Sequence, residues 1–294
     1  MSLGSYEVFV AIVERGSLAA AAQQLNLSPS AVSHALAAFE QSLGFSLFIR
    51  GRTGVRLTAG GEELLLTVRE VLQANEKLRQ HVAQLQGLET GTVTIGTISS
   101  VSVMWMPSII RSFKERFPRI KIVIEQGGYD DVTDGILKNR VDLGFVTSPG
   151  APGLELIPLY ADPLLCITPQ AFEPLNKAYM TVAELSKTNV VMQREDCGKD
   201  LHQLLNIHKV VVRACAKAVD DAAIIAMVES GLGVSVIPRL ALQHYQTTAQ
   251  VFPFAPPESR AIALASLGYE ALSPAAREMH DQIVRYVTHW ATHQ

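Results

Sequence analysis

The chain has 294 residues, of which 48% are hydrophobic and 18% are charged, and its formal net charge is −3. This length is typical of about two folding units, and the apolar content supplies buried cores. Because the net charge is negative, nucleic-acid binding through an overall positive charge is excluded. The sequence contains no uninterrupted run of about 18 apolar residues, and so it predicts no membrane span. The sequence does not start with the basic segment and apolar core that are typical of a secretory signal, and so we expect a cytoplasmic protein.

The N-terminal segment predicts three consecutive helices. The first, Ser5–Val13, carries Tyr6, Phe9, Val10 and Val13 on one face, which is the spacing of a helix that covers a small core. Ser17 is a suitable cap for a second helix over Leu18–Leu25, followed by a short turn at Asn26 and Leu27. This spacing is typical of a helix-turn-helix.

The third helix is predicted from a strong start signal, because Ser28 can cap it and Pro29 suits its first position. Its buried face holds Val32, Leu36, Phe39 and Leu43, and Gly44 ends it. The opposite face is small or hydrogen-bonding, as in helices that enter a DNA major groove: Ser30, Ser33, His34, Ala37 and Gln41.

Two short apolar runs, Leu47–Ile49 and Val55–Leu57, then flank a turn that contains Arg50 and Arg52. A hairpin with a basic tip suits a wing that holds phosphates. The alternative is a helical domain and surface hairpin that pack only against themselves. The predicted DNA-contacting residues are Ser17, Ser28, Ser30, Ser33, His34, Arg50, Arg52 and Thr58.

The segment from Ala59 to Leu88 lacks proline and keeps a heptad of mostly apolar positions. This pattern predicts a dimerisation helix in which a polar Asn75 fixes register. The alternative is a linker packed within its own chain. The seam positions are Leu64, Val68, Val71, Asn75, Leu78, Val82 and Leu85.

From residue 91 onward, strand and helix patterns alternate, which predicts an α/β domain with a mainly parallel sheet. Ligands bind such folds beyond the carboxyl ends of strands. Hydroxyls and amides at these ends suit a small polar metabolite, including one that bears a carboxylate. The predicted effector-binding residues are Thr97, Ser99, Ser100, Ser102, Gly128, Tyr129, Thr147, Gln193 and Asp220; the alternative is that these side chains merely cap helices.

These motifs resemble the LysR-type transcriptional regulators. The matching runs are GSLAAAAQQLNLSPSAVS, LGFSLFIR and LTAGGEELL in the N-terminal part, and GTVTIGT, VDLGFV and GLGVSVIP further on. His34, Ala37 and Ala38 depart from the family, in which these positions are often basic. Ser100 and Tyr129 are similar in position to residues that contact carboxylate effectors in family members.

The resemblance implies a winged helix-turn-helix over residues 1–58, a long linker helix over 59–88 and a two-lobed, periplasmic-binding-protein-like effector domain over 91–294. Lobe one would take residues 91–162 and 267–294, and lobe two would take residues 163–266. The chain would cross from lobe one to lobe two near residues 160–165 and return near residues 262–266. It also implies antiparallel pairing of the linker helices, a homodimer that becomes a homotetramer on DNA, and a partly palindromic double-stranded operator. RNA polymerase is a further candidate partner, and no membrane is expected.

Two other functions are open. Some family members sense peroxide, and Cys197 in the loop QREDCGKD is a candidate redox-sensing thiol. Cys166 and Cys215 lie in apolar strand patterns and are expected to be inert core residues. A ligand-binding module or an enzyme without specific DNA binding is the other alternative, although no nucleophile and base pair is identifiable. We expect no enzymatic activity, no metal site and no cofactor apart from a small-molecule effector.

Overall fold

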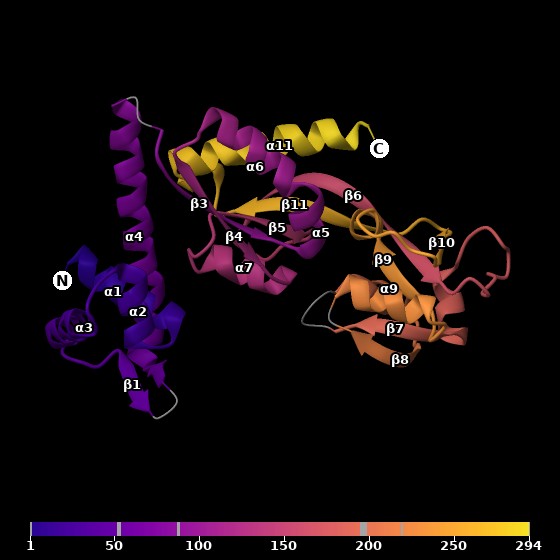
Figure 1. The fold of residues 1–294 in the computed structure, drawn as a ribbon, viewed down its shortest axis with the longest axis horizontal. Coiled ribbons are helices and arrows are strands. Elements are labelled where there is room, and N and C mark those ends of the chain that lie inside the picture. Colours follow the sequence, from indigo (N-terminus) through magenta and orange to yellow (C-terminus); the bar gives the residue numbers. More distant parts are fainter. Residues whose placement is uncertain (1, 52–53, 87–88, 195–198, 219, 294) are drawn as a thin grey trace. The chain divides into compact units, whose positions relative to one another are not determined.

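The computed structural model describes residues 2–51, 54–86, 89–194, 199–218 and 220–293. They form two compact units, one within residues 1–88 and the other comprising nearly all of residues 89–294. Figure 1 follows both units along the chain, from indigo at the N-terminus to yellow at the C-terminus.

The first unit is helical and carries a β hairpin. Its core includes the fully buried Phe9, Ile12, Val32 and Leu36, and Phe9 and Phe39 pack edge to face with ring centroids 6.0 Å apart. The elements are α1 (Leu3–Arg15), α2 (Leu18–Leu25), α3 (Pro29–Leu43), β1 (Phe48–Gly51), β2 (Gly54–Leu57) and α4 (Ala59–Leu85).

The predicted starts of α2 and α3 are confirmed by side-chain caps, whereas the predicted start of α1 at Ser5 is wrong, because α1 begins at Leu3 and is capped by Ser2. The Ser17 hydroxyl accepts a hydrogen bond from the Ala20 amide at 3.2 Å, and the Ser28 hydroxyl accepts one from the Ala31 amide at 3.1 Å. Gly44 ends α3 in the left-handed conformation, with φ of 78°, which costs glycine little. Local sequence signals therefore determine where α3 begins and where it ends.

The second unit is a mixed α/β domain in which one long strand, β6 (Glu155–Thr168), serves two groups of elements. Lobe one comprises the first part of β6 together with the following elements. They are β3 (Gly91–Thr97), α5 (Ser99–Met104), α6 (Met106–Arg116), β4 (Ile120–Gln126), α7 (Tyr129–Leu137), β5 (Leu143–Thr147), β11 (Ser259–Ser266), the 3-10 turn η2 (Tyr269–Ala271) and α11 (Pro274–Ala291).

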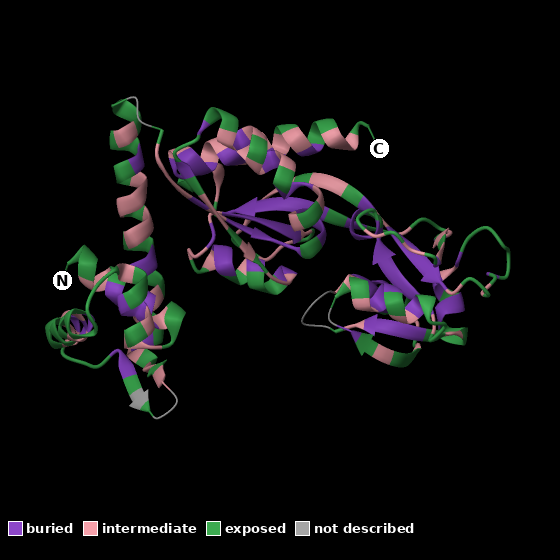
Figure 2. Cartoon of the chain, viewed as in Figure 1, coloured by how far each residue is buried: buried purple, intermediate pink, exposed green. Residues whose placement is uncertain are grey.

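Lobe two comprises the last part of β6 and the chain between β6 and β11. Its elements are the 3-10 helix η1 (Val182–Lys187), β7 (Asn189–Gln193), α8 (Asp200–His208), β8 (Arg213–Ala218), α9 (Asp221–Glu229), β9 (Ser235–Pro238), α10 (Arg239–Leu242) and β10 (Gln250–Pro253). Val190, Leu185 and Val228 are fully buried in this lobe. Most residues of strands β5, β7, β9 and β11 are buried, and they appear in purple in Figure 2.

The sheet is more mixed than the sequence predicts. Strand β3 runs parallel to β4 and β5, but β11 runs antiparallel to both β5 and β6. Strands β9 and β10 also pair antiparallel with β6. The parallel pattern holds within the first βαβ units, and the strands shared between lobes break it.

The return crossing predicted at residues 262–266 is wrong, because Ile262 pairs with Thr147 and Ala265 pairs with Gly144 inside the sheet of lobe one. Strand β11 already pairs with β6 from Ser259, opposite Pro163. Lobe two therefore ends before β11 rather than at residue 266. Residues 262–266 of the apolar run AIALAS are buried, and such a run does not reveal which sheet its strand joins.

Candidate functional site

The outward face of α3 is open in the first unit. Ser30, His34, Ala37 and Gln41 are exposed, and Ser33 is half-buried. The Ser28 and Ser30 hydroxyls are 2.9 Å apart, within hydrogen-bonding distance. The face that the sequence predicts to meet DNA is thus available and carries side chains short enough for close approach.

The hairpin that follows α3 has the position of a wing. Strands β1 and β2 pair antiparallel, with Ile49 opposite Arg56, and Arg56 is exposed. Arg50 lies in β1, and the predicted contact Arg52 lies outside the described residues. A wing arginine that the prediction omitted, Arg56, is therefore a further candidate for phosphate contact.

Three predicted DNA contacts already have structural roles. Ser17 and Ser28 cap helices, and the Thr58 hydroxyl donates to the Ser46 carbonyl at 2.8 Å while it accepts from the Gly61 amide at 3.0 Å. At Gly61, an added Cβ would lie 2.4 Å from the Leu47 carbonyl oxygen, so only glycine permits this approach of α4 to the wing. Contact of these residues with DNA stays a prediction.

The predicted dimerisation seam divides into two parts along α4. Val68 is buried in the core of the first unit, and Leu64 packs against that core. Further along, Leu78 is 62% exposed and Leu85 is 89% exposed. Val71 and Val82 are also exposed, and Asn75 is half-buried. The second half of the seam is therefore an apolar stripe open to a partner helix.

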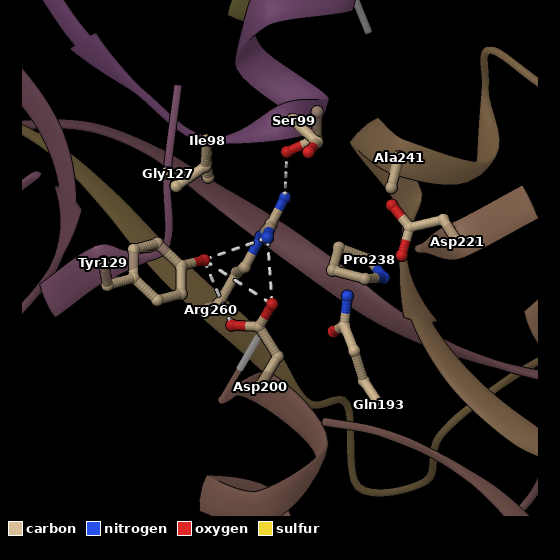
Figure 3. Close-up of a pocket in the computed structure, with 11 residues that line it drawn as sticks. Ile98, Ser99, Gly127, Tyr129, Gln193, Asp200, Asp221, Pro238, Ala241 and Arg260 are labelled. Atoms are coloured by element: carbon tan, nitrogen blue, oxygen red, sulfur yellow. Dashed lines mark hydrogen bonds and ion pairs between the residues drawn. The ribbon is translucent and has the colours of Figure 1, made fainter. Parts of the chain in front are cut away.

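A pocket in the second unit has an empty volume of about 410 Å³, including its solvent-open mouth. Four predicted effector residues line it: Ser99, Ser100, Tyr129 and Gln193. The remaining lining residues are Ile98, Gly127, Asp200, Asp221, Pro238, Ala241 and Arg260 (Figure 3). Elements of both lobes thus contribute to one pocket.

The other five predicted effector residues do not line this pocket. Thr97 is fully buried, and its hydroxyl accepts a hydrogen bond from Ser102 at 3.3 Å. Thr147 lies in β5 and pairs with Ile262. Asp220 caps α9 by accepting from the Ala223 amide at 2.8 Å, and Gly128 lies between the lining residues Gly127 and Tyr129. The helix-capping alternative therefore holds for Asp220.

Arg260, which the sequence did not identify, is the centre of the pocket. Its Nη1 donates to the Tyr129 hydroxyl and to Asp200 Oδ2, both at 2.9 Å. Its Nη2 donates to Ser100 Oγ at 2.7 Å, and its Nε donates to Asp162 Oδ2 at 2.9 Å. One buried guanidinium thus joins groups from β6, α5, α7 and α8. Figure 3 shows its contacts with Tyr129 and Asp200.

The electrostatics of this cluster keep the guanidinium charged. Burial by itself disfavours the cation, but Asp200, Tyr129 and Asp162 together raise the pKa of Arg260 above its ordinary value. Burial raises the pKa of Tyr129 strongly, and so its hydroxyl stays protonated. Tyr129 is then able to donate to Asp200 Oδ1, 3.2 Å away. The cluster is a charge-assisted hydrogen-bond network formed by the protein's own side chains.

The cysteines behave differently from one another. Cys197 lies outside the described residues. Cys166 is buried, and burial raises the pKa of its thiol, which makes it unreactive. The expectation that Cys215 is also core is wrong, because Cys215 is exposed on β8. In the described ranges no helix is both long enough and apolar enough to cross a membrane.

A capped reading helix, a wing, a long helix and a two-lobed α/β domain with a pocket between its lobes define a winged helix-turn-helix regulator with a ligand-binding domain. Residues 3–62 match the family described as bacterial regulatory helix-turn-helix protein, lysR family, and residues 86–288 match the LysR substrate binding domain. The chain therefore belongs to the LysR family of DNA-binding transcriptional regulators.

Individual proteins agree with this assignment. The chain is 29% identical to the uncharacterized HTH-type transcriptional regulator YvbU of Bacillus subtilis (strain 168), over 82% of this chain and 83% of that protein. It is 30% identical to a probable hydrogen peroxide-inducible genes activator of Streptomyces viridosporus, over 97% of both. Full-length OxyR from Pseudomonas aeruginosa has the same fold, with a TM-score of 0.78 at 23% identity over 98% of this chain and 94% of that one.

Proposed function

We propose that this regulator binds a partly palindromic operator as a dimer, or a pair of dimers, and that a small polar molecule in the Arg260 pocket changes transcription. The open face of α3 beside a basic wing is the observation that carries the DNA-binding part. The exposed stripe on α4 supports pairing, and paired reading helices require related half-sites. The proposed site of action is the cytoplasm, and RNA polymerase is a proposed partner.

The pocket supports control by a ligand because its walls come from both lobes. Ser100 and Tyr129 belong to lobe one, whereas Gln193, Asp200 and Asp221 belong to lobe two. A molecule that binds one arrangement of these walls more tightly shifts the population toward that arrangement. Such binding needs no catalytic residues, and we propose no enzymatic activity and no resident cofactor.

The test is selection of bound sequences from a random duplex pool by the purified full-length protein, followed by footprinting at two salt concentrations. A site with two related half-sites on one face of the duplex is expected. His34→Ala should change the preferred base at one position of each half-site, with a cost of about 1–3 kcal/mol against the original base. The control His81→Ala, at an exposed position of α4, should leave the selected site unchanged.

Sequence-independent retention of the wild-type protein, lost steeply as salt rises, would remove the proposed reading role of α3. An operator without two-fold relation would instead contradict the paired arrangement while leaving α3 as the reader. These two outcomes separate the reading helix from the dimer.

Redox sensing through Cys197 is a second candidate function, favoured by similarity to the peroxide-inducible activator of Streptomyces viridosporus. If it holds, peroxide will change the operator footprint of the wild-type protein but not that of Cys197→Ala. Cys215→Ala is the matched control, because Cys215 is exposed and lies elsewhere in lobe two. An equal peroxide response in wild type and Cys197→Ala would exclude this function.

A further inference from the structure

The charged side chains around the pocket are mostly acidic. Asp200 and Asp221 line it together with one cation, Arg260. Directly behind Arg260, the fully buried Asp162 forms an ion pair with Nη2 at 2.8 Å. Three carboxylates thus surround a single guanidinium, and the pocket carries an excess of negative charge when all four groups are ionised.

Most donors of Arg260 are already engaged within the protein. A guanidinium carries five N–H groups, and four of them make hydrogen bonds: Nε donates to Asp162, Nη1 donates to Tyr129 and Asp200, and Nη2 donates to Ser100. Nη2 also forms an ion pair with Asp162 at 2.8 Å. A ligand carboxylate that accepts from two donors of Arg260 would have to displace one of these partners and leave a buried group unpaired, which is costly.

The hydroxyls expected to meet a ligand carboxylate are also engaged. Tyr129 accepts from Arg260 and donates to Asp200, and Ser100 accepts from Arg260. Asp200 therefore already supplies a carboxylate to both the Arg260 guanidinium and the Tyr129 hydroxyl. Its ion pair with Arg260 Nη1 is 2.9 Å long, and both side chains are less than 10% exposed.

Asp221 is different, because its carboxylate remains open. It is the first residue of α9 and is half-buried. Among the described residues it has neither a hydrogen bond from a side chain nor an ion pair within 4 Å. Figure 3 shows the Asp221 carboxylate and the Gln193 amide directed toward the middle of the pocket. Burial raises the pKa of Asp221, as expected for a carboxylate that lacks a close cation.

We propose that the effector is a cation, an amine or a guanidine, whose charged group pairs with Asp221 beside the Gln193 amide. This inference rests on the proposed function and specifies the ligand class of the same pocket. A cation supplies what the pocket lacks, because a partly buried carboxylate is stabilised by a paired, hydrogen-bonded opposite charge. An anion would meet repulsion from Asp200 and Asp221.

The experiment is a thermal-shift and calorimetric screen of the full-length protein against equal sets of cationic, neutral and anionic metabolites. A matched four-carbon series, putrescine, 1,4-butanediol and succinate, is included together with agmatine. Hits are expected among the cations. Asp221→Asn should weaken their binding by about tenfold or more, whereas Asp221→Glu, which keeps the charge, should retain part of it. Glu115→Gln, which removes an exposed charge on α6, is the control.

The outcomes separate this inference from the proposed function. Hits confined to anions or neutral compounds would overturn the cationic class and leave control by a small molecule intact. Cationic hits that bind Asp221→Asn as tightly as wild type would overturn the role of Asp221 and with it the inference. No hit in any class, together with an unchanged operator footprint, would overturn both.

Discussion

Arg260 and Asp200 form a buried ion pair of 2.9 Å that connects strand β11 to helix α8. The two residues are 60 positions apart in the chain. Ser100 and Tyr129 bind the same guanidinium from lobe one. The pocket is therefore held by one side chain at the junction of the lobes, and its properties depend on how that side chain is neutralised.

Replacing Arg260 with methionine should destabilise the protein strongly. The change leaves Asp162 and Asp200 as buried carboxylates without their cation, and breaking such pairs costs about 3–5 kcal/mol. Urea unfolding of full-length protein, followed by tryptophan fluorescence, reports this because Trp105 and Trp290 both lie in the second unit. Arg213→Met, at an exposed position of β8, is the control. A variant as stable as wild type would show that the cluster is not needed for folding.

Replacing Asp221 with asparagine should instead stabilise the ligand-free protein. Burial is the largest cause that raises the pKa of Asp221, Asp200 and Asp220 add to it, and Arg260 opposes it. Because the folded-state pKa lies above the unfolded value, the wild-type carboxylate penalises folding at neutral pH. This penalty disappears as the pH falls through the folded pKa. The free energy of unfolding at pH 7 is expected to rise by about 0.5–2 kcal/mol, which is the usual size of a single stabilising substitution.

Melting temperatures of wild type and Asp221→Asn, measured from pH 7 downward, check the sign. The difference should be largest at neutral pH and shrink toward the ordinary carboxyl value of 3.8. Glu115→Gln should show no comparable difference. A variant that is less stable than wild type at pH 7 would mean that Asp221 supports the fold rather than the pocket.

The elements that sequence predicted well depend on local signals. Ser28, Pro29 and Gly44 all belong to the ends of α3, and each affects only the backbone next to it: Ser28 and Pro29 start the helix, and Gly44 ends it. The strand-end rule likewise found Ser99, Ser100 and Tyr129, because helices α5 and α7 begin where β3 and β4 end. Such residues are placed by the chain immediately around them, and so their positions follow from short stretches of sequence.

The rest of the pocket depends on long-range packing. Arg260 is the second residue of an otherwise apolar strand, and Asp200 is the last residue of the run QREDCGKD, which contains Cys197. Neither residue has a sequence neighbour that indicates its partner, since the contacts arise only when β11 lies beside β6 and α8 approaches α7. Thr97 and Ser102 do not line the pocket; instead, the Ser102 hydroxyl in α5 donates a hydrogen bond to the Thr97 hydroxyl at the end of β3.

The exposed apolar stripe on α4 predicts which substitution should dissociate the dimer. Leu78→Asp places a charge at a position that is 62% exposed in the single chain but would be covered in the pair. Two leucines per dimer would each lose about 1.5–3 kcal/mol of burial, so the dimer should dissociate at about 100-fold higher concentration or more. Sedimentation over a concentration series measures this. Gln84→Asp, which is exposed on α4 outside the heptad positions, should dimerise normally; equal dissociation of both variants would place the interface elsewhere.

The wing makes a quantitative prediction about salt. Arg56 is exposed on β2 opposite Ile49 of β1, and we expect it to contact a phosphate rather than a base edge. If each copy of Arg56 contacts one phosphate, Arg56→Ala should reduce the slope of log affinity against log salt by about 0.9 per contact, hence by about 2 for a dimer. The loss should be similar for selected and random duplexes, because phosphate contacts carry no sequence information. Binding measured at four salt concentrations tests this, with Arg79→Ala on α4 as the control. An unchanged slope with altered sequence preference would place Arg56 at a base edge instead.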